Sequence, residues 1–182
     1  MNLVEIMIAT TLGMAVMIGG LDILAFGARH QIDTVRQMRL QGDASLAWRT
    51  METALRQSTV ILTPASTAAT TDVLLGCENY DPRSGVLDPS KPVAAYMFCE
   101  NAGKLYYHRI SPSTCPMIDQ PRCTAPEAII VADHVSHLSG TDSYFSRPSK
   151  GLVRFVYETS SAGASQSIDV TVAYNAAAGA NQ

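Results

Sequence analysis

The stretch Glu5–Leu21, EIMIATTLGMAVMIGGL, places one carboxylate at the front of an otherwise apolar run. On insertion scales a charged side chain costs roughly 2.5–3.5 kcal/mol near the centre of a bilayer. Glu5 therefore needs a positive partner when this segment reaches its working state.

The nearest candidate partner for Glu5 is an N-terminal ammonium. The amine of the same chain, on Met1, lies about one helical turn away, because a helix rises about 1.5 Å per residue. A neighbouring chain that is shifted along its axis could bring its own amine there instead. In that second arrangement the charge pair fixes the register of stacked helices, while burial of apolar surface supplies the attraction.

The apolar run has the length of a membrane anchor. Residues 6–28 could span the hydrocarbon core, which needs about 20 residues, although Asp22 interrupts them. A cleaved secretory signal is disfavoured, because nothing basic occurs before Arg29 and an acid stands where a positive region belongs. Two acids in the segment also disfavour a permanent anchor that contacts lipid alone.

The first residues carry a family resemblance. Asn2–Ala9, NLVEIMIA, followed by Leu12 and Gly13, resembles the mature N-terminus of type IV pilins and of type II secretion pseudopilins. That family removes a basic leader and methylates the new N-terminal residue, which is usually phenylalanine. The resemblance implies that Met1, as in some type IVb pilins, is the processed terminus. It also implies a chain held in the bacterial inner membrane before assembly and in a surface filament afterwards, with other pilins and the assembly machinery as partners.

One long helix is predicted from about residue 2 to about residue 58, since no proline occurs before Pro64. Residues 1–28 should form its hydrophobic half, which is the membrane anchor or filament core. Residues 29–58 should form an amphipathic half that packs on a globular domain. The predicted buried face is spaced by four, three, four and four residues, at Leu40, Ala44, Ala47, Met51 and Leu55.

Glycines weaken the first half of this helix. Gly13, Gly19, Gly20 and Gly27 each cost about 0.5–1 kcal/mol relative to alanine. One interpretation is local flexibility, a bend or melt, since the comparable region of pilins unwinds in the filament. The other is that small residues allow helices to pack closely. Both remain open.

From Thr59 to residue 182 the composition predicts an antiparallel β-rich head. Two pairs of strands should form hairpins, through Asn101–Gly103 and Ser160–Ser165. The expected fold class is therefore α+β and pilin-like, with one antiparallel sheet packed on the helix. The order of the segments resembles that of the larger minor pilins of the PilW type and of pseudopilin J. The predicted strands are 73–75, 93–98, 104–110, 128–131, 152–157 and 167–174.

Four cysteines lie in the head, and an even number suits an oxidising compartment. Three pairings are formally open. Local geometry favours Cys77–Cys99 and Cys115–Cys123, because the second bridge would close the proline-bordered loop Pro116–Arg122. No cysteine pair has zinc-ligand spacing. His134 and His137 could share one helical turn as ligands, but we expect surface histidines that flank Val135, and we predict no metal.

Four tyrosines, Tyr96, Tyr106, Tyr107 and Tyr157, are expected to make cross-strand packing pairs rather than a binding surface. Asp22 is expected to pair with Arg29 or with a neighbouring helix, or else to mark the membrane interface.

No nucleophile elbow, phosphate loop, zinc-protease motif or haem attachment motif occurs, so we predict no enzyme and no cofactor. A net charge of −3 disfavours nucleic acid as a partner. We expect a structural filament subunit, in which other copies or other pilins are the partners. The alternatives are a minor or priming pseudopilin and a membrane-tethered monomeric periplasmic binding domain, whose ligand would lie on the sheet or the 115–123 loop. A tethered hydrolase is a third rival.

Overall fold

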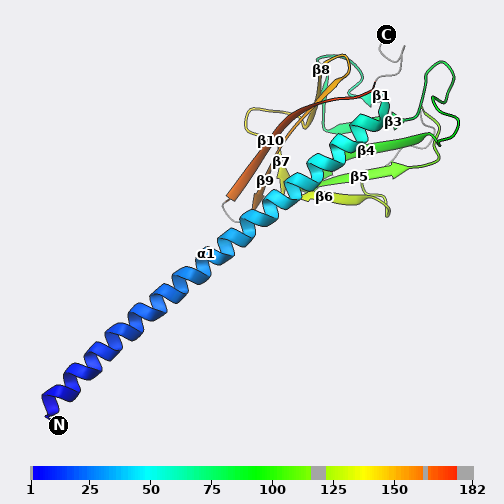
Figure 1. The fold of residues 1–182 in the computed structure, drawn as a ribbon. Helices are drawn as coiled ribbons and strands as arrows, with labels where there is room; N and C mark the ends of the chain where they lie inside the picture. Colours follow the sequence, from blue (N-terminus) through cyan, green and yellow to red (C-terminus); the bar gives the residue numbers. More distant parts are fainter. Residues whose placement is uncertain (1, 116–121, 162–163, 176–182) are drawn as a thin grey trace. The chain divides into compact units, whose positions relative to one another are not determined.

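The computed structural model describes residues 2–115, 122–161 and 164–175. A long helix, α1 (Leu3–Gln57), is followed by an antiparallel β domain, so the predicted α+β class is confirmed (Figure 1). The chain divides into two compact units, residues 1–39 and 40–182. The strands are β1 (Ser58–Thr63), β2 (Thr70–Thr71), β3 (Val73–Glu78), β4 (Ala94–Asn101), β5 (Lys104–Ile110), β6 (Ile129–Asp133), β7 (Val135–Ser136), β8 (Phe145–Ser149), β9 (Leu152–Ser161) and β10 (Ala164–Ala173).

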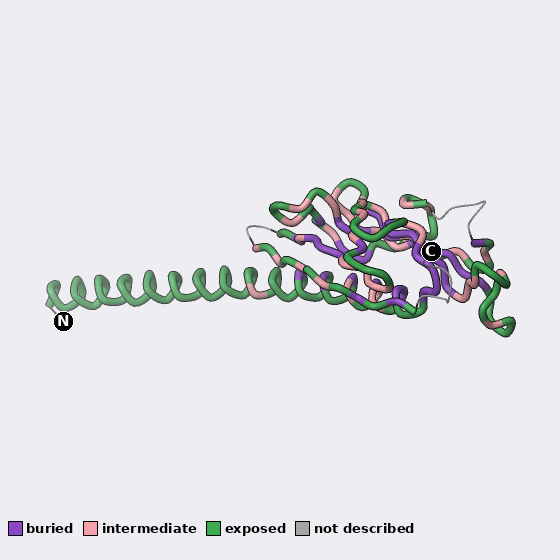
Figure 2. The backbone as a smooth tube through the Cα atoms, turned by 90° about the horizontal axis from the view of Figure 1, so that it is seen from above, coloured by how far each residue is buried: buried purple, intermediate pink, exposed green. Residues whose placement is uncertain are grey.

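The first unit is the N-terminal part of α1. Every residue from 2 to 33 is exposed, as the continuous green segment of the tube in Figure 2 shows. The helix is unbroken at Gly13, Gly19 and Gly20. Its apolar side chains therefore have no covering layer within the described part of the chain.

The second unit begins with the amphipathic end of α1. Residues Leu40, Ala44, Ala47, Met51 and Leu55 are all buried, which is the face that the spacing predicts. Of these, Ala47, Met51 and Leu55 belong to one hydrophobic core together with residues from strands of the head, including Leu74, Phe98 and Phe155. After residue 40, α1 therefore buries one apolar face and leaves its other faces exposed.

The head contains two sheets where the sequence predicted one. Among the described residues, one sheet has the strand order β1-β3-β4-β5-β6, and the other has the order β10-β9-β8-β2 with β7 also paired to β9. All of these pairings are antiparallel. The prediction of a single sheet was wrong because β1, β2, β7 and β8 were not recognised; β2 and β7 have only two residues each.

Both predicted hairpins are present. β4 and β5 are joined by Ala102 and Gly103, whose φ angles of 52° and 75° suit the two central residues of a tight hairpin turn. β9 and β10 pair over their full lengths, from Ala164 opposite Ser161 to Ala173 opposite Leu152. Positions 162 and 163 of the second loop lie outside the described residues.

The predicted disulfide pairing was wrong. The bridges join Cys77 to Cys115 and Cys99 to Cys123. The strand register explains why, because Cys77 on β3 is opposite Ala95, four positions from Cys99 along β4. At about 3.3 Å per residue this offset separates the two cysteines by about 13 Å, far beyond disulfide reach. The two bridges instead join Cys115 to β3 and Cys123 to β4, which are adjacent strands.

Candidate functional site

The first candidate site is the apolar half of α1. Within residues 3–28 the only charged side chains are those of Glu5 and Asp22. The hydroxyl of Thr10 donates to the Ile6 carbonyl oxygen at 2.9 Å, and that of Thr11 donates to the Met7 carbonyl oxygen at 3.0 Å. These hydroxyls are satisfied inside the helix, so the carboxylates dominate the polar character of the segment.

Glu5 makes a local capping contact. The backbone N–H of Asn2 donates to the Glu5 carboxylate at 3.1 Å, and the backbone N–H of Glu5 donates to the Asn2 carbonyl oxygen at 2.9 Å. This reciprocal arrangement satisfies donors at the start of the helix. It leaves the charge of Glu5 without a cation among the described residues, and Met1 lies outside them.

Asp22 and the glycines in the first half of α1 make few contacts in the described part of the chain. Asp22 makes no ion pair with Arg29 in the described part of the chain. A β-carbon placed on Gly13, Gly19 or Gly20 would meet nothing within 4 Å. These glycines therefore leave open backbone surface along an exposed helix, on which another helix could approach closely.

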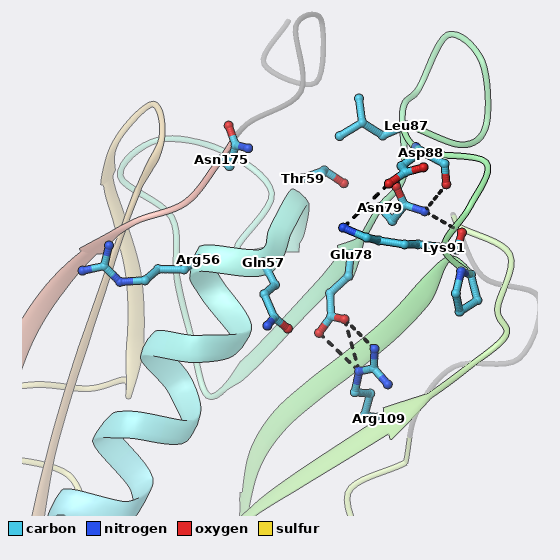
Figure 3. Close-up of a pocket in the computed structure, with 11 residues that line it drawn as sticks. Arg56, Gln57, Thr59, Glu78, Asn79, Leu87, Asp88, Lys91, Arg109 and Asn175 are labelled. Atoms are coloured by element: carbon cyan, nitrogen blue, oxygen red, sulfur yellow. Dashed lines mark hydrogen bonds and ion pairs between the residues drawn. The ribbon is translucent and has the colours of Figure 1, made fainter.

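The second candidate site is a hollow of about 550 Å³ in the head (Figure 3). The end of α1, the start of β1, β3, β5 and the segment after β3 supply its walls. Its side chains are mainly polar, with three cations and two carboxylates. The lining residues are Arg56, Gln57, Thr59, Glu78, Asn79, Leu87, Asp88, Lys91, Pro92, Arg109 and Asn175.

The charges that line this hollow are largely paired. Arg109 donates to both Glu78 oxygens, at 2.7 Å from Nη2 and at 3.2–3.3 Å from Nε. The hydrogen bond that Arg109 donates to Glu78 is the main reason why the pKa of Arg109 is raised. Lys91 lies 3.7 Å from Asp88, whose pKa is lowered chiefly by the side-chain hydrogen bond from Ser90. Each of the two carboxylates that line the hollow therefore has a cation beside it.

A second hollow of about 310 Å³ shares Gln57 with the first. Arg49, Thr50, Thr53 and Ala54 line it from α1, and Tyr107 lines it from β5. Burial, and then the charge of Glu78, raise the pKa of Tyr107 to about 12, so its hydroxyl is protonated at neutral pH. We call the two hollows together the head groove.

The two histidines considered as metal ligands are exposed, and two of the four tyrosines are buried. His134 and His137 flank β7 and are exposed, and the Nε2 of His137 lies 3.0 Å from an Asp72 oxygen. In the described ranges no cluster of three or more metal-ligating side chains occurs. Tyr96 and Tyr157 are buried in the core, as expected for packing residues.

Sequence reasoning missed the head groove. Arg49 and Gln57 come from α1 and Arg109 comes from β5, and no motif links them. Tyr107 was identified only as part of an aromatic group. The chain direction after Glu78 and the pairing of β3 with β4 bring these residues together, and neither was readable from the sequence.

The fold and these two sites define an α+β protein whose N-terminal helix is long and apolar enough to cross a membrane. The chain matches no protein-family model, no curated protein and no solved structure.

Proposed function

We propose that this chain is a structural subunit of a type IV pilus-like filament. Its N-terminal helix lies in the bacterial inner membrane before assembly and in the filament core afterwards, while the disulfide-linked head lies outside. Glu5 pairs with the N-terminal amine of a neighbouring subunit. The chain acts by assembly and not by catalysis.

The observation that carries this proposal is an exposed apolar helix with one carboxylate in its first turn. Large apolar exposed patches on folded proteins mark membrane or protein contacts. The segment 3–28 presents such side chains around its whole circumference, each 47–75% exposed. They are Leu3, Val4, Ile6, Met7, Ile8, Leu12, Met14, Val16, Met17, Ile18, Leu21, Ile23, Leu24 and Phe26.

The interaction energies favour a role for Glu5 in setting the register between subunits over a role in capping its own helix alone. An acid in the first turn of an exposed helix gains about 0.3–1 kcal/mol from the helix dipole. A pair of unit charges 4 Å apart interacts by about 4 kcal/mol at an effective dielectric constant near 20. In a water-poor filament core, a shifted register would leave the carboxylate unpaired, so the charge pair selects one axial step.

A membrane-tethered monomeric binding domain is the second candidate, and the head groove favours it. This function needs the anchor but no contact between subunits. It therefore predicts that the protein is a monomer in detergent and that substitution of Glu5 does not change its function.

Electron microscopy of fibres sheared from cells that make this protein, with mass spectrometry of their N-termini, tests the proposal. We expect fibres that contain this chain and carry a methylated Met1. Fibres that contain only this chain would identify a major subunit, and a low proportion among other pilins would identify a minor one. Recovery of the chain only as membrane monomers, with fibres that lack it, would contradict the proposal.

A further inference from the structure

We propose that the head groove binds an acidic carbohydrate, through Arg49 for the sugar carboxylate and through Gln57 and Tyr107 for its hydroxyls. This inference concerns the head alone and holds whether or not the chain polymerises. Every residue that it uses belongs to the second compact unit.

The size of the groove suits a small ligand. Ligand pockets usually measure about 300–1,000 Å³, and both the 550 Å³ hollow and the 310 Å³ hollow lie in that range. Gln57 lines both of them, so a sugar ring in either hollow can reach its side chain.

The charge of the groove favours an anion. Arg56 is paired with Glu52 at 2.8 Å and points away from the Glu78–Arg109 pair (Figure 3). Lys91 and Arg109 each have a carboxylate partner within the groove. Arg49 makes no ion pair or hydrogen bond through its side chain among the described residues, so its guanidinium is the available cation. This unpaired charge lies on a chain whose net charge is −3.

The uncharged polar groups favour a ligand with many hydroxyls. The side chains of Gln57, Tyr107 and Asn175 make no hydrogen bond in the described part of the chain, although all three face the groove. Gln57 points toward the Glu78–Arg109 pair in Figure 3. An amide both donates and accepts, and so does a phenol, which matches the donor and acceptor capacity of sugar hydroxyls.

The backbone around the groove disfavours an extended acidic peptide. Tyr107 lies on β5, which is paired with β4 on one side and with β6 on the other. The backbone groups of residues 49–57 lie within α1. At the 310 Å³ hollow, which only α1 and β5 line, an added peptide strand would therefore find no free edge, so recognition there depends on side chains.

Isothermal titration of the full chain in detergent micelles tests this inference with two acidic probes, trigalacturonic acid and 3′-sialyllactose. The neutral counterparts are the trimethyl ester of trigalacturonic acid, and lactose. We expect at least one acidic probe to bind about tenfold more tightly than its counterpart. Arg49→Gln should weaken that binding by about tenfold or more, and Tyr107→Phe should weaken it by about three- to tenfold.

Lys150→Gln is the matched control, because it also removes one exposed positive charge but lies in the turn between β8 and β9, outside the groove. The affinity of Lys150→Gln for the acidic probe should equal that of the unaltered chain. Four results would overturn the assignment: no binding of either acidic probe, equal binding of the neutral counterparts, equally tight binding of triglutamate, or an equal loss in Lys150→Gln. Circular dichroism of each variant separates loss of binding from loss of folding.

Discussion

Gly76 on β3 lies directly opposite Tyr96 on β4, and the phenol ring of Tyr96 covers it. A β-carbon placed on Gly76 would be 2.5 Å from the Tyr96 hydroxyl oxygen and 2.7 Å from the ring carbon that bears it. Tyr96 is fully buried, and its hydroxyl is hydrogen-bonded to that of Ser58. The ring therefore cannot move aside without displacing buried neighbours or losing this hydrogen bond.

Gly76→Ala should lower the free energy of unfolding by about 1–3 kcal/mol through overpacking. Gly42→Ala is the control, because nothing lies within 4 Å of a β-carbon at that helical position. It should raise stability by about 0.5–1 kcal/mol. Urea unfolding followed by the fluorescence of Trp48, whose ring centroid lies 5.6 Å from that of Phe155, measures both effects. An unchanged midpoint for Gly76→Ala would show that the core around Tyr96 can adapt.

Two leucines on α1 test how the helix packs on the head. Leu55 is completely buried, whereas Leu46 is 54% exposed. Leu55→Ala should cost about 2–5 kcal/mol, since it leaves a cavity in the core. Leu46→Ala should change stability by about 0.5 kcal/mol or less. Equal effects in the same urea titration would contradict the described packing face.

The disulfide pairing can be tested directly on the oxidised protein. Trypsin can cut after Arg83, Lys104, Arg109 and Arg122, which places each cysteine in a separate peptide. Mass spectrometry without reduction should recover Cys77 joined to Cys115 and Cys99 joined to Cys123. Peptides that join Cys77 to Cys99 would contradict the structure.

Replacing either cysteine pair with serines should lower stability substantially. The bridges close loops with sequence separations of 38 and 24 residues. Loop-closure entropy then predicts a loss of about 3–4 kcal/mol for each pair. Thermal unfolding of the two double variants measures these losses, and a loss near zero for both would show that the bridges do not stabilise the head.

Alkaline pH should destabilise the head through its tyrosines. Burial is the main reason why the pKa values of Tyr107 and Tyr144 are raised to about 12 in the folded protein. The ordinary tyrosine pKa is about 10, so the unfolded chain releases these protons first. The stability that these two tyrosines contribute is complete below about pH 10 and is lost as the pH rises toward about 12. Tyr107→Phe should reduce the fall in stability across that range, and an unchanged fall would contradict the described burial of Tyr107.

The spacing of apolar residues and the turn residues identified the features that depend on local sequence. The spacing from Leu40 to Leu55 predicted the buried helix face, and the turn residues between β4 and β5 predicted that hairpin. The disulfides and the head groove depend instead on strand register and on which distant strands become neighbours. Cys77 could be excluded as a partner of Cys99 only once its position opposite Ala95 was known.

The most direct test of the filament proposal compares Glu5→Gln with Glu5→Ala. Glutamine keeps a carbonyl oxygen that can accept the Asn2 N–H, which the carboxylate now accepts at 3.1 Å, but it carries no charge. The fraction of each variant recovered in sheared fibres, relative to the membrane pool, is the measurement. The proposal predicts that both variants lose incorporation by about tenfold or more, because both lack the charge that pairs with a neighbour's amine. Incorporation of Glu5→Gln at the level of the unaltered chain would show that Glu5 only caps its own helix, and would contradict the proposed pairing.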